Sequence, residues 1–152
     1  MAEDTKPNAF NPDGVPPPPP TYKHVCIMPL IPGSVDLITL AGLTGCDASA
    51  SSNPTTVFGQ ALVAYQKIKT CLASAGATPR DIVQVKHYIV KETGDPEVDK
   101  LDVVDRGWAK AWIEFMEREA GEHRPPDTVV GVACLAKGDI LYECEVWAVV
   151  RK

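Results

Sequence analysis

Two carboxylates interrupt the last apolar segment of the chain, where Glu143 and Glu145 alternate with Cys144 and Val146. Successive side chains of a β-strand point to opposite faces of its sheet. A strand over Ile140–Val150 therefore places both glutamates on one face and apolar side chains on the other. Two explanations are open. The face is solvated, as is usual for charged residues, or it lines a pocket or subunit interface where a carboxyl group exchanges protons.

Thiols and imidazoles are the other side chains able to bind metals. The five cysteines and three histidines have no spacing typical of a zinc site or a disulfide framework. Most of the cysteines lie inside apolar runs, so we expect small buried side chains rather than ligands or disulfide partners. We predict no metal and no cofactor. These residues are Cys26, Cys46, Cys71, Cys134 and Cys144, with His24, His87 and His123.

The charge of the chain bears on its partners. It holds 15 lysines and arginines against 20 aspartates and glutamates, a net charge of −5. Nucleic-acid phosphates are bound by clustered cations, and the basic residues here are dispersed, so we expect no nucleic-acid partner. No apolar run approaches the roughly 18 residues of a membrane span, and no basic segment precedes an apolar one at the N-terminus. We therefore expect a cytoplasmic protein with no membrane partner.

The length of 152 residues suits one domain with a real core. Residues 1–20 hold Pro7, Pro12 and the run Pro16–Pro20, a composition typical of polyproline II and unable to form a core. We expect residues 1–20 to form an extended arm that lies on the domain or on a partner subunit. Residues 21–152 then form an α+β domain.

The first half of this domain predicts a hairpin and a helix. Apolar runs at Tyr22–Leu30 and Val35–Leu43 flank Pro32-Gly33-Ser34, which indicates two antiparallel strands. Asn53-Pro54 is typical of an N-cap followed by proline at the first helical position. Apolar residues then recur at helical spacing up to Gly76, which predicts an amphipathic helix of about five turns.

The second half begins with a strand and a second helix. Asp81–Val90 is apolar enough for a buried strand. Asp95-Pro96 then repeats the cap pattern of the first helix, and apolar residues follow at helical spacing until Gly121. Leu101 and Val104 belong to the predicted inner face of this helix.

The last two apolar runs, Thr128–Leu135 and Ile140–Val150, flank the turn Lys137-Gly138-Asp139 and predict an antiparallel hairpin. The first run is apolar on nearly every residue, as expected of a strand buried on both faces. The element order is then β-β-α-β-α-β-β. This order predicts an α+β fold with a mixed sheet, a parallel central pair of strands and two helices on one face.

The opposite face of that sheet has no helix to cover it. At about 25 cal/mol per Å², leaving a broad apolar face in water costs many kcal/mol, comparable to the whole stability of a domain. We therefore predict a homotrimer in which the sheets cover one another. The residues expected on this face are Val25, Ile27, Val83, Val85, Val130 and Val132.

Several features, taken in this order, resemble the reactive intermediate deaminase family, the YjgF-type proteins. The resemblance covers about residues 22–150. It implies a fold similar to chorismate mutase-type domains, assembled as a trimeric barrel with pockets between subunits. The features are Tyr22, Ala41-Gly42 where the family has Ser-Gly, Gln60 and Ala75-Gly76 of the helix, Asp81-Ile82-Val83, and the strand with Glu143 and Glu145.

The resemblance also implies a reaction, the hydrolysis of reactive enamines and imines to keto acids and ammonia. This chemistry needs a cation for the substrate carboxylate, a polarised water and a carboxylate that shuttles protons. The family supplies the cation in a Pro-x-Arg-Ser pattern, where this chain has Pro125-Pro126-Asp127-Thr128. Asp127 reverses that charge, which favours a neutral or cationic substrate. Val129 stands where a Cys is common, and Lys67 stands where the helix usually has Asn.

A set of site residues follows from the resemblance. Glu143 matches the family's catalytic carboxylate, and burial would raise its pKa so that it serves as acid or base. His24 is either a second proton carrier or a structural residue, and Arg124 either reaches the pocket or is solvated. We predict catalytic roles for Glu143, Asp127, Tyr22 and His24, and substrate binding by Thr128, Arg124, Trp108 and Val129.

Two functions of different classes remain open. One is a small-molecule enzyme that performs acid–base or hydrolytic chemistry on an imine, enamine or enol-like metabolite in a pocket between subunits. The other is a non-catalytic metabolite-binding or scaffold trimer that has lost its arginine and its deaminase activity together. A ribonuclease, as some relatives are labelled, is disfavoured by the acidity of the chain.

Overall fold

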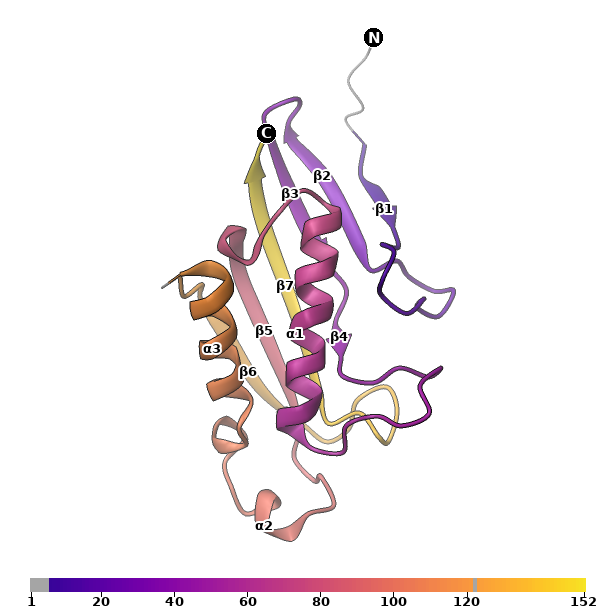
Figure 1. Cartoon of the computed structure of the whole chain (residues 1–152), viewed down its shortest axis with the longest axis vertical. Helices are drawn as coiled ribbons and strands as arrows, with labels where there is room; N and C mark the ends of the chain where they lie inside the picture. Colours follow the sequence, from indigo (N-terminus) through magenta and orange to yellow (C-terminus); the bar gives the residue numbers. More distant parts are fainter. Residues whose placement is uncertain (1–5, 122) are drawn as a thin grey trace.

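One mixed β-sheet with two main helices on a single face makes up the computed structural model (Figure 1). The structure describes residues 6–121 and 123–152, so residues 1–5 of the predicted arm lie outside the described part. The predicted α+β architecture is confirmed. In chain order the elements are β1 (Asn8–Phe10), β2 (Val25–Ile31), β3 (Val35–Leu40), β4 (Leu43–Thr44), α1 (Val57–Ser74), η1 (Pro79–Asp81), β5 (Ile82–Val90), α2 (Pro96–Asp99), η2 (Val103–Asp105), α3 (Trp108–Ala120), β6 (Asp127–Val132) and β7 (Tyr142–Arg151).

The strands lie in the order β1-β2-β3-β7-β5-β6, and the short β4 also pairs with β7. Neighbouring strands are antiparallel except β5 and β6, which are parallel. The chain joins β5 to β6 through α3, the long connection that parallel strands need. β7 is flanked by β3 and β4 on one side and β5 on the other, so it presents side chains to both faces in the middle of the sheet.

The predicted hairpin near the N-terminus is confirmed as β2 and β3. Its turn is closed by a hydrogen bond from the Ser34 N–H to the Ile31 carbonyl (2.9 Å). Gly33 has a φ of 73°, a backbone conformation that glycine adopts without steric cost. Pro32 before it supplies the fixed φ that suits the preceding turn position.

The predicted hairpin at the C-terminus is wrong, because β6 and β7 lie on opposite sides of β5 and do not pair. The connection through α3 places β6 beside β5 in parallel, and residues 133–141 then carry the chain to the other side of β5 (Figure 1). β6 is consequently an edge strand. Its residues are exposed or half-buried in the single chain, not buried on both faces, and the parallel pair lies at the edge of the sheet, not at its centre.

The first helix starts later than predicted, because Asn53 is not its cap. Thr56 is the N-cap of α1, and its hydroxyl accepts a hydrogen bond from the Gly59 N–H (3.0 Å). Asn53 instead stabilises the preceding loop: its side chain accepts from the Asp47 N–H (2.8 Å) and donates to the Asp47 carbonyl (3.1 Å). The predicted C-terminal stop is confirmed, since α1 ends two residues before Gly76.

The predicted second helix is divided into the short α2 and the longer α3. Asp95 caps α2 as expected, accepting a hydrogen bond from the Glu97 N–H (3.0 Å), but α2 ends at Asp99. Leu101 and Val104, predicted on the inner face, lie outside both helices and are 46% and 47% exposed. The periodic pattern therefore applies only from Trp108 onward.

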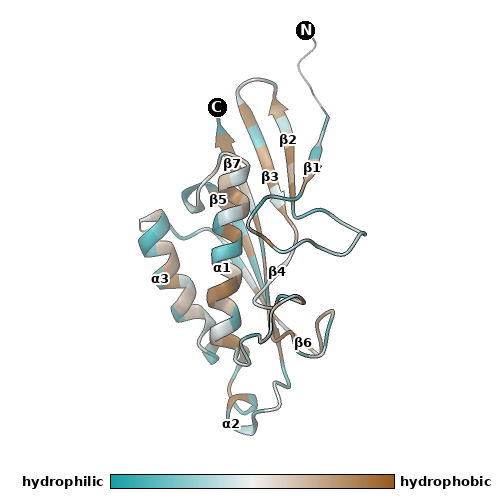
Figure 2. Ribbon diagram, turned by 45° about the vertical axis from the view of Figure 1, so that its right-hand side comes forward, coloured by the Kyte–Doolittle hydropathy of each residue, from teal (hydrophilic) through white to brown (hydrophobic). Residues whose placement is uncertain are grey.

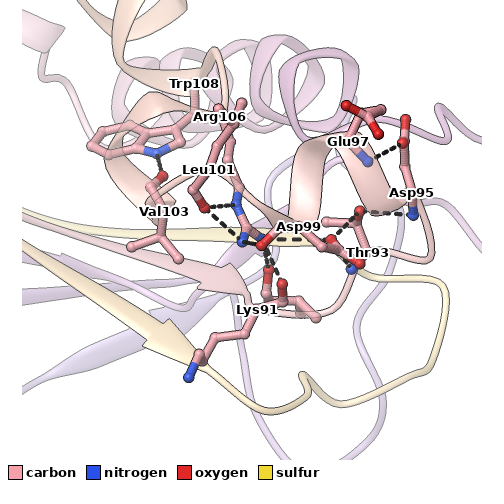
Figure 3. Close-up of polar contacts among 10 residues, drawn as sticks. Lys91, Thr93, Asp95, Glu97, Asp99, Leu101, Val103, Arg106 and Trp108 are labelled. Carbon is pink, nitrogen blue, oxygen red and sulfur yellow. Dashed lines mark hydrogen bonds and ion pairs between the residues drawn. The ribbon is translucent and has the colours of Figure 1, made fainter.

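Arg106 holds the segment between α2 and α3 in place (Figure 3). Its buried guanidinium donates hydrogen bonds to the carbonyls of Val90 (2.7 Å), Lys91 (2.8 Å) and Leu101 (3.0 Å). Nη1 also lies 4.0 Å from a carboxylate oxygen of Asp99. Because the guanidinium offers five N–H donors in one plane, a single side chain satisfies carbonyls at the end of β5 and after α2.

The hydrophobic core lies between the sheet and the two helices, which run side by side over the same face (Figure 1). Figure 2 shows apolar residues on the central strands behind α1. Among the described helices, none is long and apolar enough to cross a membrane. Fully buried side chains of this core include Tyr65, Ile68, Leu72, Val85, Ile89, Phe115, Met116 and Val146.

Three of the residues predicted on the uncovered face lie on the core side of the sheet instead. Val25 and Val85 are fully buried beneath the helices, and Ile27 packs against the same core. The strand register explains this, because it pairs Val85 with Val146 of the core-facing row of β7. Val83 is 44% exposed, and Val130 and Val132 of β6 are half-buried.

Charged residues also lie on the uncovered face. The Lys86 Nζ is 3.5 Å from a carboxylate oxygen of Glu145 and 5.9 Å from the centre of the Trp147 ring. Both contacts follow the register of β5 and β7, which pairs Lys86 with Glu145 and Gln84 with Trp147. The uncovered face is therefore a mixture of apolar and paired charged side chains.

The described part of the N-terminal arm is attached to the domain. Its strand β1 extends the sheet by pairing with β2, with Phe10 opposite Val25. The chain then forms a long loop before it returns to β2 (Figure 1). Within this loop Val15 is only 8% exposed and belongs to the hydrophobic core, so the Pro-rich segment contributes one core residue that its composition did not predict.

Candidate functional site

A cavity of about 550 Å³ lies between the N-terminal loop, the segment joining β3 to β4, α1 and the loop before β7. Small-molecule pockets typically have volumes of about 300–1,000 Å³. One wall is apolar and is made by Val15 and Pro16–Pro19. The ionisable residues that line the cavity are Tyr22, His24, Cys46, Asp47, Lys67, Lys137, Asp139 and Glu143.

Glu143 of β7 is the central acidic residue of this cavity. Gly42 allows its close approach, since a Cβ at position 42 would overlap the Glu143 carboxylate. The strand is held by Gln60 of α1, whose side-chain oxygen accepts a hydrogen bond from the Leu141 N–H (2.7 Å). Burial raises the pKa of Glu143 above its ordinary value of 4.5, and the neighbouring charge of Glu145 raises it further. Glu143 is thus suited to both donating and accepting a proton.

Tyr22 and His24 line the cavity together with Glu143 of the same chain. Burial raises the pKa of the Tyr22 hydroxyl, and the Glu143 charge adds to that effect. The rings of Tyr22 and His24 meet edge to face with centroids 5.8 Å apart. His24 also holds the loop: its Nε2 is 2.9 Å from the Pro16 carbonyl, and its N–H donates to the Asn11 side chain (3.1 Å). In the described structure His24 therefore positions a wall of the cavity.

Lys67 is the residue of the cavity whose role the sequence did not reveal. Its Nζ donates hydrogen bonds to the carbonyls of Thr44 (2.8 Å) and Cys46 (2.9 Å). Burial lowers the pKa of Lys67, and the charge of Asp47 partly opposes that shift. The sequence did carry a signal. Lys67 lies three residues after the buried Ala64 and four before the buried Cys71, which places it beside the core-facing stripe of α1.

The other predicted site residues lie outside this cavity. Asp127, at the start of β6, has a 48% exposed side chain, and its Oδ2 is 3.8 Å from the His87 Nε2. Thr128 is exposed beside it, in register with Lys86. Arg124 contacts a carboxylate oxygen of Glu117 (3.2 Å). Within the single chain these residues do not join Glu143.

Two further predicted binding residues belong to the core region. Trp108 is 3% exposed, and its Nε1 donates a hydrogen bond to the Val103 carbonyl (2.7 Å). Its ring lies against that of His87, with centroids 4.3 Å apart. Val129 is partly buried and packs against the same core. Trp108 is therefore a core residue and does not line the cavity.

A buried polar chain centred on His87 was not anticipated from the sequence. The His87 Nδ1 is 2.6 Å from the Tyr142 hydroxyl, which is 2.8 Å from the Tyr65 hydroxyl. The Tyr65 hydroxyl in turn donates to the Trp108 carbonyl (3.2 Å). Burial lowers the pKa of His87 to about 3, so the ring is neutral at neutral pH. The approach of Asp127 at 3.8 Å is therefore not an ion pair, and it is longer than a hydrogen bond.

The cysteines and the possible metal ligands are dispersed in the described part of the chain. No cluster of three His, Cys, Asp or Glu side chains arranged for a metal ion occurs in residues 6–121 and 123–152. All five cysteines are free thiols. Cys71 and Cys144 are buried as expected, whereas Cys134 is exposed in the loop after β6. Burial raises the pKa of Cys46, the thiol that lines the cavity, so it is predominantly protonated at neutral pH.

Known proteins share this fold. A family model described as Endoribonuclease L-PSP matches residues 32–150. A search of curated proteins found no match. E. coli TdcF, solved with bound serine, is 19% identical with a TM-score of 0.71, over 94% of this chain and 98% of that one. A Mycobacterium tuberculosis member of the YjgF/YER057c/UK114 family is 21% identical with a TM-score of 0.66, over 95% of this chain and 100% of that one.

A third solved structure is YyfA from Yersinia pestis, described as a protein of the Rid family. It is 16% identical with a TM-score of 0.71, and the alignment covers 95% of this chain and 100% of that one. At such identities the solved structures establish the fold alone. The predicted YjgF-like fold, related to chorismate mutase-type domains, is confirmed.

Proposed function

The chain belongs to the endoribonuclease L-PSP family, the YjgF or Rid family, and from this premise we propose that it is a small-molecule enzyme. Its reaction would be acid–base or hydrolytic chemistry on an imine, enamine or enol-like metabolite. The observation that carries the proposal is Glu143, a half-buried carboxyl group with a raised pKa on the wall of a cavity of about 550 Å³. A group of this kind is a frequent general acid or base.

The proposed steps use Glu143 in both protonation states. The protonated carboxyl group donates to the nitrogen of an imine, which makes the carbon electrophilic. Water adds to that carbon, and the resulting carboxylate accepts a proton from the added water. Glu143 then returns that proton to the nitrogen, and the C–N bond breaks as the added hydroxyl group gives its proton to the Glu143 carboxylate. This yields a carbonyl compound and ammonia and restores the protonated carboxyl group. Tyr22, beside Glu143, is placed to donate a hydrogen bond to the substrate.

The charges of the cavity bear on which substrate it would bind. Asp127 stands where the family has its carboxylate-binding arginine, and no basic side chain takes its place on β6. Lys67 is a cation of the cavity, but two of its N–H groups are already bonded to Thr44 and Cys46. Lys67 is therefore committed mainly to the loop. We propose a substrate that is neutral or cationic at its reactive end.

The proposed enzyme is a homotrimer, as the family resemblance implies. The edge strand β6 and the uncovered sheet face are the surfaces that an assembly would cover. In such an assembly Asp127 and Thr128 of one subunit are proposed to reach the Glu143 cavity of the next. Light scattering should give a mass about three times 16.4 kDa. A monomer at micromolar concentration would contradict the shared site while leaving the Glu143 cavity intact.

The test of the proposed reaction is turnover. Carboxylate-free imines formed by an amine oxidase from ethylamine, 3-methylbutylamine and 2-phenylethylamine are supplied, and the release of ammonia is compared with the spontaneous rate. We expect acceleration by the wild-type protein and a loss of about 10²- to 10⁴-fold in Glu143→Gln. Glu145→Gln is the matched control, because Glu145 lies on the same face of β7 but does not line the cavity. Equal rates for Glu143→Gln and the wild type would refute the acid–base role.

A non-catalytic metabolite-binding or scaffold protein is the second candidate, and the loss of the family arginine at Asp127 favours it. It predicts saturable binding of imine analogues without turnover. The family description as an endoribonuclease suggests RNA, but the net charge of −5 opposes phosphate binding. RNA cleavage by the purified protein would overturn both candidates.

A further inference from the structure

One wall of the Glu143 cavity is made by a segment that precedes the region matched by the family model. The model matches residues 32–150, whereas Val15 and Pro16–Pro19 lie in the loop between β1 and β2. These residues share the cavity with Tyr22, His24 and Glu143. The Pro-rich segment, defined here as Val15–Pro19, is therefore part of the site and not a detached arm.

Contacts before the Pro-rich segment and at its first two residues hold it against the domain. Before it, β1 is paired with β2, and the Asn11 side chain accepts a hydrogen bond from the His24 N–H (3.1 Å). Within it, the Pro16 carbonyl lies 2.9 Å from the His24 Nε2, and the Val15 side chain is buried in the core. The position of this wall is thus fixed by contacts that do not depend on a ligand.

The chemistry of the wall is unlike that of the rest of the cavity. Four consecutive prolines have no N–H donors, and their rings restrict the backbone, so little conformational freedom remains to be lost on binding. Their ring carbons make an apolar surface. The same cavity is also lined by the carboxyl group of Glu143 and the ammonium group of Lys67. A ligand that fills the cavity must therefore combine a polar end with an apolar body.

We propose that the Pro-rich segment determines specificity, by selecting substrates with a branched or aromatic apolar body beyond the reactive C=N group. This inference rests on the proposed function for the chemistry at the C=N end of the substrate. What it adds concerns the binding of the apolar end. A cavity of about 550 Å³ is far larger than a two-carbon imine needs, and a phenyl or isobutyl group would fill more of it. Each buried CH₂ group should strengthen binding about fourfold.

Binding is tested apart from turnover with three stable neutral amides: acetamide, isovaleramide and phenylacetamide. Their affinities for the full chain are measured by NMR titration. The wild type should bind phenylacetamide and isovaleramide at least tenfold more tightly than acetamide. Pro17→Ser and Pro18→Ser replace residues of the wall, and Pro20→Ser is the matched control, since Pro20 is exposed and does not line the cavity. Urea unfolding checks that each variant is folded.

The expected result is that Pro17→Ser and Pro18→Ser each weaken binding of the two larger amides about fivefold or more, with acetamide and Pro20→Ser unaffected. Similar affinities for all three amides, unchanged affinities in both wall variants, or no binding of any amide up to its solubility limit would each overturn the proposal. If the protein prefers the larger amides but does not hydrolyse imines, the proposed reaction fails and the proposed role of the Pro-rich segment in binding stands. If hydrolysis depends on Glu143 but not on substrate size, the proposed reaction stands and the proposed role of the Pro-rich segment fails.

Discussion

Consecutive residues of one strand, β7, lie in two different environments. Glu143 lines an open cavity beside Tyr22, and partial burial raises its pKa. Tyr142, one residue earlier, points to the opposite face and joins the buried chain with His87 and Tyr65. Burial there is so complete that the His87 ring is 0% exposed and its pKa falls to about 3.

The carboxyl group of Glu143 can exchange protons, whereas the ring of His87 cannot at neutral pH. Asp127, His87 and Tyr142 have the residue types of a proton relay, but the ring is neutral, enclosed by Trp108 and not reached by any cavity described above. Its Nε2 finds no hydrogen-bond partner in the described part of the chain. Glu143 is instead partly open to solvent. We infer that the His87 cluster stabilises the fold and that the Glu143 cavity binds the ligand.

The largest expected effect is on stability and comes from His87→Ala. The substitution removes a fully buried ring that stacks on Trp108 and leaves the Tyr142 hydroxyl without its partner. The free energy of unfolding should fall by about 3 kcal/mol or more. Urea denaturation measures it. Glu143→Gln, on the other face of β7, should change the same quantity by only about 0.5 kcal/mol. Equal losses in the two variants would remove the distinction between the regions.

A smaller effect, on function, is expected from Gly42→Ala. The added Cβ would overlap the Glu143 carboxylate and push it out of position. Displacement of a catalytic group by about 1 Å can reduce turnover about 10²-fold. Gly138→Ala is the control, because a Cβ there meets no atom within 4 Å. Imine hydrolysis by Gly42→Ala at the wild-type rate would show that the position of Glu143 is not critical.

The smallest effect is a change in stability between pH 7 and pH 5, to which the two regions contribute with opposite signs. The His87 pKa is about 3 when folded and about 6.5 when unfolded, so the unfolded state binds the extra proton between these values. The contribution of His87 is complete above pH 6.5 and falls by about 1.4 kcal/mol per pH unit below it. The raised pKa of Glu143 acts the other way, because just above pH 4.5 the folded state takes up its proton first.

Urea denaturation at several values between pH 7 and pH 5 isolates the His87 contribution. The difference in unfolding free energy between the wild type and His87→Gln should shrink as the pH falls, because only the wild type carries this titration. His24 and His123 are present in both proteins and cancel in the difference. A difference that stays constant from pH 7 to pH 5 would show that His87 is not held neutral.

The elements of the fold that were predicted correctly are those with periodic side-chain patterns or a clear turn. Strand alternation around Glu143 and the Pro32-Gly33 turn gave the correct elements, because both depend on local side-chain direction and turn chemistry. The C-terminal hairpin failed for a non-local reason. Residues 133–141 resemble a turn in composition, yet the crossover through α3 had already placed β6 on the far side of β5. Which strands become neighbours depends on the whole sheet.

The site was predictable only in part. Glu143, Tyr22 and His24 do share one cavity, since the strand and the segment before β2 meet there. Lys67 and the Pro-rich segment were missed because their contacts join residues distant in sequence, such as Lys67 with Thr44 and Cys46. Asp127 was grouped with Glu143 by family resemblance, and within the single chain it lies near His87 instead.

The central claim, that Glu143 is a proton-exchanging group in a binding cavity, can be measured directly. Carboxyl carbons of ¹³C-labelled glutamate are followed by NMR through a pH titration, and the Glu143 signal is assigned by its loss in Glu143→Gln. The account predicts a midpoint above the ordinary value of 4.5 and a change in this signal when phenylacetamide is added. A midpoint at or below 4.5, with a signal insensitive to the amide, would contradict it.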